Sequence, residues 1–287
     1  MSVKSLQELI DERFEHDSQE LPVFNRVALQ LRQLRTISSV TMKQVTELIL
    51  QDQALASRIL KVANSSFYGG LKQVDTLSGA VMRLGMGRVV SLAMVAAQMH
   101  AHSAKIKIVA EHMPQLWRRA YFCAIGARWV AEQSGHGNLA EEAFLCALLH
   151  DVGELFLLKA LERLALDKEQ AIVLNDALIR EILESMHNAI GGRLMEQWNL
   201  PEHYVRVARA HHDETCDPGD ILLVSVRLLD IVCRKLGIGQ PADPSIVLAA
   251  TEEALALGLK EIKLAQLEVM LEDLLATAGP GGQALAE

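Results

Sequence analysis

The sequence predicts an all-α protein, and two observations lead to that prediction. Hydrophobic residues make up 50% of the 287 residues but aromatic residues only 4%, so aliphatic side chains supply most of the apolar surface. This composition favours packed helices over a β-sandwich, which needs more threonine, tyrosine, phenylalanine and tryptophan. Apolar residues also recur at three- and four-residue steps along most of the chain, the spacing of a buried helix face.

The first half of the chain is expected to form a series of short helices. The periodicity predicts helices at 5–14, 21–35, 39–52 and 52–66, and two more within 76–99 that meet at residues 84–87. Pro22 suits a first helical turn, Ser39 and Thr41 are candidate caps, and Asp52 opens the fourth helix. Gly69 and Gly70 mark a loop.

A second set of helices is expected to begin near Met113 and Pro114. Its members are predicted at 115–133, 139–161, 175–200, 201–213, 221–239, 243–259 and 263–279. The stretch "DETCDPGD" (213–220) is the clearest loop in the chain, and residues 280–287 read as a frayed tail.

Charge and cysteine usage exclude several protein classes. The net charge of −8 argues against a broad nucleic-acid or membrane surface, so neither partner is expected. The four cysteines form no C-x-x-C pair, and Cys123 and Cys146 lie in apolar stretches, which suits a reduced cytoplasmic compartment. The N-terminus lacks the apolar core of a signal peptide, and the most apolar run, 89–99, is too short to span a bilayer.

Several ionisable side chains interrupt the apolar helices. They are His150, Asp151, His187, His211, His212 and Asp230. An ionised carboxylate in an apolar helix is costly unless it is paired or bound to a metal. Neutral imidazole is the commonest metal ligand. One divalent ion held by several helices would satisfy all these groups, and iron, manganese and zinc each suit nitrogen and oxygen ligands.

A purely structural interpretation of these residues remains open. A helix can carry a satisfied histidine or a salt-bridged aspartate without any ligand, and a His-Asp dipeptide alone is weak evidence. Asn64, Ser65 and Ser66 have the same ambiguity, because these residue types also satisfy the backbone groups at a helix end.

Several motifs together resemble the HDOD family, a relative of the HD and HD-GYP metal-dependent phosphohydrolases. The N-terminal half contributes "LPVFNRVALQLRQL", "ILQDQALASRILKVANSSFYGG" and "TLSGAVMRLGMGRVVSLAM". The second half adds "LLHDVGEL", "HNAIGGRLMEQWNLPE" and "ARAHHD". The resemblance covers about residues 20 to 235. It implies a multi-helix HD-like bundle with an N-terminal helical subdomain at 1–110, a metal-site subdomain at 111–240 and C-terminal helices at 241–287.

The resemblance also implies roles for the ionisable residues. The implied metal ligands are His150, Asp151, His187, His211, His212 and Asp230. If the chain is an enzyme, Asp151 is its catalytic residue. The alignment of Asp230 depends on a loop of variable length.

The chain departs from the catalytic relatives in three places. Their first histidine falls at Arg119, whose guanidinium is expected to pair with a carboxylate such as Asp151, or to bind phosphate. Glu154 stands where they have a lysine, and "HHDETCDPGDI" lacks their Gly-Tyr-Pro segment for cyclic dinucleotides. In the dinuclear relatives one ion is held by the first histidine, the His-Asp pair and the late aspartate, and that site is damaged here. The resemblance implies that the other ion is held by the shared aspartate and three later histidines. That set is complete here: Asp151, His187, His211 and His212.

Three functions are consistent with these features. The family is generally regarded as regulatory, which favours a signalling module that contacts a protein partner and retains one metal ion. The alternative is a metal-dependent phosphohydrolase that acts on a nucleotide or another phosphoester. The third is a sensor that binds a phosphorylated small molecule through Arg119 and the histidines. The partner, the metal and the oligomeric state are left open by the sequence.

Overall fold

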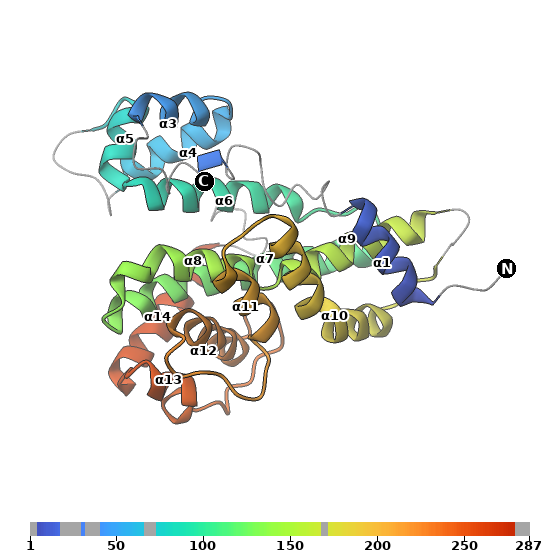
Figure 1. The fold of residues 1–287 in the computed structure, drawn as a ribbon. Coiled ribbons are helices and arrows are strands. Elements are labelled where there is room, and N and C mark those ends of the chain that lie inside the picture. The colour runs from blue at the N-terminus through green and yellow to red at the C-terminus, as the bar shows by residue number, and fades with distance from the viewer. Residues whose placement is uncertain (1–4, 18–29, 32–40, 66–72, 168–171, 279–287) are drawn as a thin grey trace. The chain divides into compact units, whose positions relative to one another are not determined.

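The computed structural model describes residues 5–17, 30–31, 41–65, 73–167 and 172–278 (Figure 1). Within these ranges the regular structure is helical and contains no strand, which confirms the all-α prediction. In the same ranges no single helix has the length and apolarity to cross a membrane. One pair, Leu77–Leu84 with Met86–Met99, reaches that length and composition only when joined across a bend of 108°.

The described residues form two compact units. The large unit contains those of Met1–Leu21 and His102–Leu285, and the small unit contains those of Pro22–Ala101. These bounds differ from the three predicted segments, because the first helix, α1 (Leu6–Asp17), packs within the large unit. Its Phe14 is buried, and the ring lies 5.4 Å from that of Phe156.

The small unit begins its helices at polar side chains. Its described helices are α3 (Met42–Ile49), α4 (Gln53–Ala63), α5 (Leu77–Leu84) and α6 (Met86–Ala101). Thr41, Asp52 and Thr76 each accept a hydrogen bond from the backbone N–H three residues later. The predicted caps Thr41 and Asp52 are thus confirmed. Gly85, with a φ of 78°, separates α5 from α6 at the predicted place.

Two other predictions for the small unit fall outside the described residues. One is the cap at Ser39, and the other is the helix at 21–35, of which only residues 30 and 31 are described, both helical. The first-turn role of Pro22 and the loop at Gly69 and Gly70 also lie outside the described residues.

Asn64 joins the end of α4 to the segment before α5. Its amide donates to the carbonyl oxygen of Val74 and accepts from the N–H of the same residue, both at 2.8 Å. Arg83 of α5 donates to the carbonyl of Ala63 at 3.0 Å. Because both ends of the Asn64 amide are used by the backbone, these contacts support the structural interpretation of this residue. Ser66 lies outside the described residues.

The large unit is arranged around one long helix. Its helices, besides α1, are α7 (Lys107–Gln133), α8 (Ala140–Leu149), α9 (Val152–Leu166), α10 (Asp176–Gln197), α11 (Glu202–Ala210), α12 (Ile221–Leu236), α13 (Glu252–Ala256) and α14 (Glu261–Ala278), with 3₁₀ turns η1 (Gly137–Leu139) and η2 (Leu248–Ala250). Helix α7 packs against α8, α9, α12 and α14. Phe122 and Cys123 of α7 and Cys146 of α8 are buried in this core, as the sequence predicted for the two cysteines.

The prediction of one helix at 139–161 was wrong. Helix α8 ends at Leu149 and α9 begins at Val152, so His150 and Asp151 form the turn between them. Apolar residues continue on both sides of this turn, and their spacing therefore concealed the break. Because they lie in this turn, the side chains of His150 and Asp151 need not follow the directions that one continuous helix would impose.

Two other helix boundaries were also predicted wrongly. Helix α7 begins at Lys107 and continues through Pro114, although the sequence placed its start after that proline. The predicted helix at 243–259 is reduced to η2 and the five-residue α13. Asp243 accepts hydrogen bonds from both the N–H and the hydroxyl of Ser245, and such local bonding competes with a helix.

Helix α9 also holds the segment from which α7 starts. Glu162, a buried carboxylate, accepts hydrogen bonds from the N–H groups of Lys105 and Ile106, the second at 2.9 Å. Lys159 donates to the carbonyl of Ser103. Ile106 offers no side-chain cap to α7, so Glu162 supplies the missing acceptor and its negative charge at the helix N-terminus.

Gly153 allows α9 and α10 to approach each other closely. A Cβ at this position would lie 2.0 Å from the carbonyl oxygen of His187 and 2.8 Å from the N–H nitrogen of Gly191. Both neighbours are backbone atoms, so they cannot move aside as a flexible side chain would. This crossing brings Asp151, two residues before Gly153, close to His187.

We expect Gly153→Ala to lower the free energy of unfolding by about 3 kcal/mol, because the added methyl must push α10 away. Urea denaturation followed by circular dichroism measures the change. Gly137→Ala is the matched control, since a Cβ there meets nothing within 4 Å. Equal stability of the two variants would contradict the close approach.

Glu162→Ala is expected to lower the free energy of unfolding by about 1–3 kcal/mol, because two buried backbone N–H groups lose their acceptor. The same denaturation experiment tests it, with Glu181→Ala on an exposed position of α10 as the control. If both variants unfold at the same urea concentration, Glu162 does not cap α7.

Candidate metal centre

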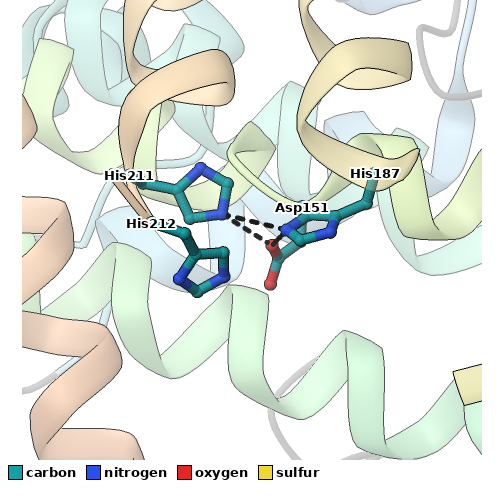
Figure 2. A group of neighbouring side chains, drawn as sticks. All are labelled: Asp151, His187, His211 and His212. Atoms are coloured by element: carbon teal, nitrogen blue, oxygen red, sulfur yellow. Dashed lines mark hydrogen bonds and ion pairs between the residues drawn. The ribbon is translucent and has the colours of Figure 1, made fainter. Parts of the chain in front are cut away.

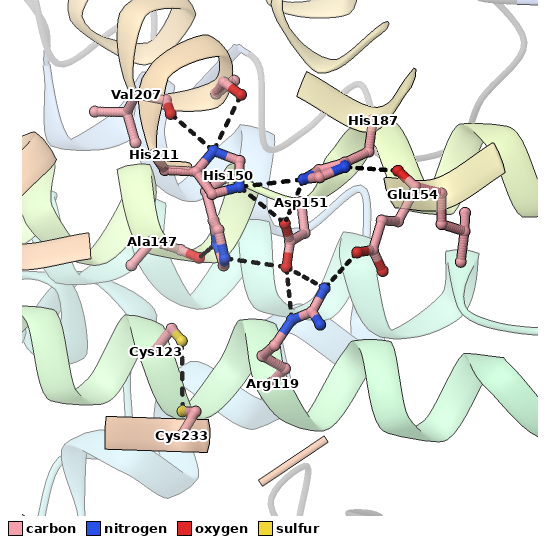
Figure 3. Close-up of polar contacts among 12 residues, drawn as sticks. Arg119, Cys123, Ala147, His150, Asp151, Glu154, His187, Val207, His211 and Cys233 are labelled. Atoms are coloured by element: carbon pink, nitrogen blue, oxygen red, sulfur yellow. Dashed lines mark hydrogen bonds and ion pairs between the residues drawn. The ribbon is translucent and has the colours of Figure 1, made fainter. Parts of the chain in front are cut away.

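The turn between α8 and α9 places two ionisable side chains in the interior of the large unit. His150 is 1% exposed and Asp151 3% exposed. Asp151 is the residue from which α9 starts, and its side chain forms no cap on that helix. Its carboxylate is instead directed at side chains from α7, from α10 and from the turn after α11 (Figure 3).

Four of the predicted ligands converge at this point. Asp151 meets His187 from the middle of α10 and His211 and His212 from the end of α11 (Figure 2). One ligand atom from each residue can be chosen so that all four lie within 4.8 Å of one another. Asp151, His187 and His211 are buried, whereas His212 is exposed to solvent. The group combines three ring nitrogens with one carboxylate oxygen.

The hydrogen bonds of the two buried rings fix which nitrogen faces the centre. Nδ1 of His187 donates to the carbonyl oxygen of Leu183 at 2.6 Å, and Nδ1 of His211 lies 3.1 Å from those of Val207 and Ala208. A carbonyl only accepts, so Nδ1 carries the proton and Nε2 of each neutral ring presents a lone pair. This is the orientation that metal-binding histidines adopt.

The lone pairs face each other without a donor between them. Nε2 of His187 lies 3.4 Å from Nε2 of His211. Oδ1 of Asp151 is buried without a hydrogen-bond partner among the described residues, 3.3 Å from Nε2 of His211 and 3.8 Å from Nε2 of His187. Three converging electron-pair donors in a buried site repel one another unless a cation or a shared proton lies among them. The geometry therefore fits a metal ion.

The other oxygen of Asp151 is already neutralised. Arg119 of α7 donates from Nε to Oδ2 at 2.7 Å and from Nη2 to Glu154 Oε1 at 2.6 Å, and Nε2 of His150 lies 3.0 Å from the same Oδ2 (Figure 3). Burial raises the pKa of Asp151, but Arg119 and His150 outweigh it and hold that pKa well below its usual range. The pairing predicted between Arg119 and Asp151 is thus present.

Two of the histidine rings in the centre, those of His211 and His212, favour the neutral form that binds metals. Burial lowers the pKa of His211. The exposed ring of His212 is still partly desolvated, and this loss of water together with neighbouring His211 lowers its pKa to about 4. At neutral pH both rings are therefore available as ligands. The set of three nitrogens and one oxygen suits iron, manganese or zinc.

Two predicted ligands lie outside the group of four. His150 donates from Nδ1 to the carbonyl of Ala147 at 2.6 Å and directs Nε2 to the Oδ2 side of Asp151. Asp230 of α12 lines the same cavity as His187 and His212 but is not one of the four clustered ligands. Its carboxylate has no hydrogen bond or ion pair with the described residues. The structure thus separates a cluster of four from His150 and Asp230.

A cavity of about 750 Å³ opens beside the cluster. His187, His212 and Asp230 lie along it, and Arg119 and Glu154 form another part of its wall. Gln240 also lines it, and the side-chain nitrogen of this residue is buried without a hydrogen-bond partner in the described part of the chain. No pattern in the sequence indicated a role for Gln240, which follows two loop glycines, Gly237 and Gly239. A molecule in this cavity would have access to a metal held by the cluster.

Gly239 fixes this loop against the helix that carries Arg119. It has a φ of 74°, and a Cβ would lie 2.6 Å from the carbonyl oxygen of Gln115 and 2.7 Å from Cβ of Arg119. Both the backbone conformation and the contact thus require glycine. The loop after α12 is in this way part of the site.

Comparison with known proteins identifies similar chains. The family model described as the HDOD domain matches residues 21–214. An uncharacterised protein of Treponema pallidum is 26% identical over 199 residues, which are 68% of this chain and 38% of that protein. This chain therefore spans well under half the length of that relative.

Solved structures share the fold. An HDOD domain protein of unknown function from Geobacter sulfurreducens has a TM-score of 0.66 and 21% identity, over 98% of both chains. A Shewanella amazonensis protein named as a candidate metal-dependent phosphohydrolase has a TM-score of 0.65 and 19% identity, over 92% of this chain and 98% of that one. A candidate signal transduction protein of Marinobacter aquaeolei has a TM-score of 0.63 and 22% identity, over 98% and 64%. These identities support a common fold alone.

We predict that the purified protein contains about one iron, manganese or zinc ion per chain, and that His187→Ala and Asp151→Asn each remove it, since each deletes a ligand. Elemental analysis by mass spectrometry measures the content. His16→Ala, an exposed histidine of α1, is the control and should keep the ion. An ion retained in both site variants, or absent from the unaltered protein supplied with each metal, would contradict the site.

Proposed function

Because the chain belongs to the HDOD domain family, we propose that it is a regulatory module that acts through protein contacts and holds one divalent ion in its large unit. Asp151, His187, His211 and His212 would hold the ion, which would act as a fixed positive charge and a Lewis acid. His150 and Arg119 orient the carboxylate of Asp151 from its other side. The protein partner would be a signalling protein.

The observation that carries the proposal is the position of Arg119. Its guanidinium is bonded to Oδ2 of Asp151 and to Glu154, so the side of Asp151 that faces away from the cluster already has its positive charge. A second ion there would meet the guanidinium at close range and be repelled. In-line attack on a phosphoester gains much from two ions that bind the attacking and leaving oxygens. A site limited to one ion favours binding over hydrolysis.

Exposed hydrophobic side chains support the protein-contact part of the proposal. Met42, Leu50 and Met82 of the small unit are 36%, 60% and 70% exposed. Exposed apolar side chains mark a partner surface when they form a continuous patch, so these three residues are the candidates for such a contact.

A phosphohydrolase is the second candidate, and one observation favours it. Two of the four clustered residues, His187 and His212, line a cavity of about 750 Å³, which has room for a nucleotide-sized phosphoester beside the ion. The phosphate-sensor interpretation has less support. It relied on Arg119, but two of the nitrogens of this side chain already donate to carboxylates.

We expect the metal-loaded protein to hydrolyse bis(p-nitrophenyl) phosphate no faster than the free metal ion, because it holds one ion instead of two. Arg119→His should raise the bound metal towards two ions per chain, since it replaces a cation by a ligand. Absorbance at the nitrophenolate band and elemental analysis measure the two effects.

Arg180→His is the control for this experiment. Arg180 lines the same cavity, but its guanidinium pairs with Asp176 at 2.6 Å, and it is exposed. It should change neither the metal content nor the rate. Turnover by the unaltered protein, abolished by Asp151→Asn, would overturn the regulatory proposal in favour of the enzyme.

A further inference from the structure

Of the two histidines that follow α11, only His211 is held by hydrogen bonds to its own helix. Helix α11 ends at Ala210, and His211 and His212 lie in the turn that follows. His211 is buried. The exposed ring of His212 lies 5.2 Å from that of His187 and 4.3 Å from that of His211, between ring centroids, and forms no hydrogen bond with the described residues. Whether His212 reaches the cluster therefore depends on the backbone of this turn.

Arg227 of α12 contacts that backbone directly. Its Nη1 donates to the carbonyl oxygen of Asp213 at 2.5 Å and lies 3.5 Å from that of His211. These two carbonyls flank His212. The guanidinium of Arg227 thus contacts the backbone on both sides of His212, whose side chain must reach the metal. The Arg227 side chain itself is only 14% exposed.

Glu253 of α13 holds Arg227 in place. Its Oε1 accepts from Nε of Arg227 at 2.9 Å, and its side chain is 7% exposed. The planar guanidinium is therefore fixed at two edges, by a carboxylate on one and by backbone carbonyls on the other. A buried glutamate without this partner would be costly, so the pair is constrained as a unit.

We propose that Arg227 and Glu253 are positioning residues for the metal centre, which hold the turn at residues 211–213 so that His212 completes the set of ligands. The proposal rests on the proposed metal site. It extends that site beyond residues 21–214, the part that the HDOD model matches, into α12 and α13. These helices thus contribute to metal binding although they supply none of the four clustered ligands.

The test uses the full chain loaded with Co²⁺, whose ligand-field absorption reports the number and geometry of its ligands. Affinity is measured by competition with a chelator, and folding by circular dichroism. Arg227→Lys keeps the positive charge but cannot bond Glu253 and the backbone carbonyls at once as the guanidinium does. It should weaken Co²⁺ binding about tenfold, as the loss of a residue that supports a metal ligand typically does. Its spectrum should change in the same direction as that of His212→Ala.

Glu253→Gln keeps an acceptor for Arg227 and should weaken Co²⁺ binding less, by about threefold. This variant tests the proposal if Arg227→Lys does not fold. The double variant Arg227→Lys with His212→Ala should bind no more weakly than His212→Ala alone, because Arg227 acts through His212. A loss of stability alone would not produce this dependence. Arg209→Lys, an exposed arginine of α11, and Glu252→Gln, an exposed neighbour of Glu253, are the matched controls.

Two results would overturn the proposal, and they can be told apart. If the unaltered protein binds Co²⁺ and folded Arg227→Lys and Glu253→Gln bind it with the same affinity and spectrum, the positioning role is wrong and the metal site stands. If the unaltered protein does not bind Co²⁺, the metal site fails and the positioning role with it.

Discussion

The carboxylate of Asp151 is the group on which the rest of the large unit depends. One of its oxygens is neutralised by Arg119, and the other is left without a hydrogen bond among two ring nitrogens. A buried carboxylate is tolerated only when both oxygens are satisfied. The first is satisfied by the protein itself. The second calls for a cation, and this difference between the two oxygens explains why the site suits one ion.

The surrounding architecture keeps this carboxylate where it is. The break between α8 and α9 allows the Asp151 side chain to point towards residues of other helices. Gly153 lets α10 approach closely enough for His187 to reach Asp151. Helix α7 delivers Arg119, and α9 in turn holds the start of α7 through Glu162. The same pair of helices is therefore tied together at the metal centre and again near the segment that leads to the small unit.

The sequence predicted the helices well where apolar spacing is regular, and failed where the backbone departs from it. Periodicity continued across His150 and Asp151, so it concealed the turn that creates the site. The sequence left two interpretations of Asn64 open, and its hydrogen bonds to Val74, ten residues away, favour the structural one. The convergence of His187 with His211 was first suggested by ionisable side chains in apolar helices, and the family resemblance then assigned both as ligands. Gln240 and Arg227 depend on contacts between distant segments, for which one sequence offers no spacing signal.

We infer that Arg119 takes the place of a second cation at Asp151. Anomalous diffraction from crystals of the protein loaded with Mn²⁺ locates every bound ion together with the arginine. We expect one peak, bounded by Asp151, His187, His211 and His212, with the Arg119 guanidinium still on Oδ2 of Asp151. Two peaks that share the Asp151 carboxylate, with Arg119 displaced from it, would show that Arg119 does not exclude a second ion.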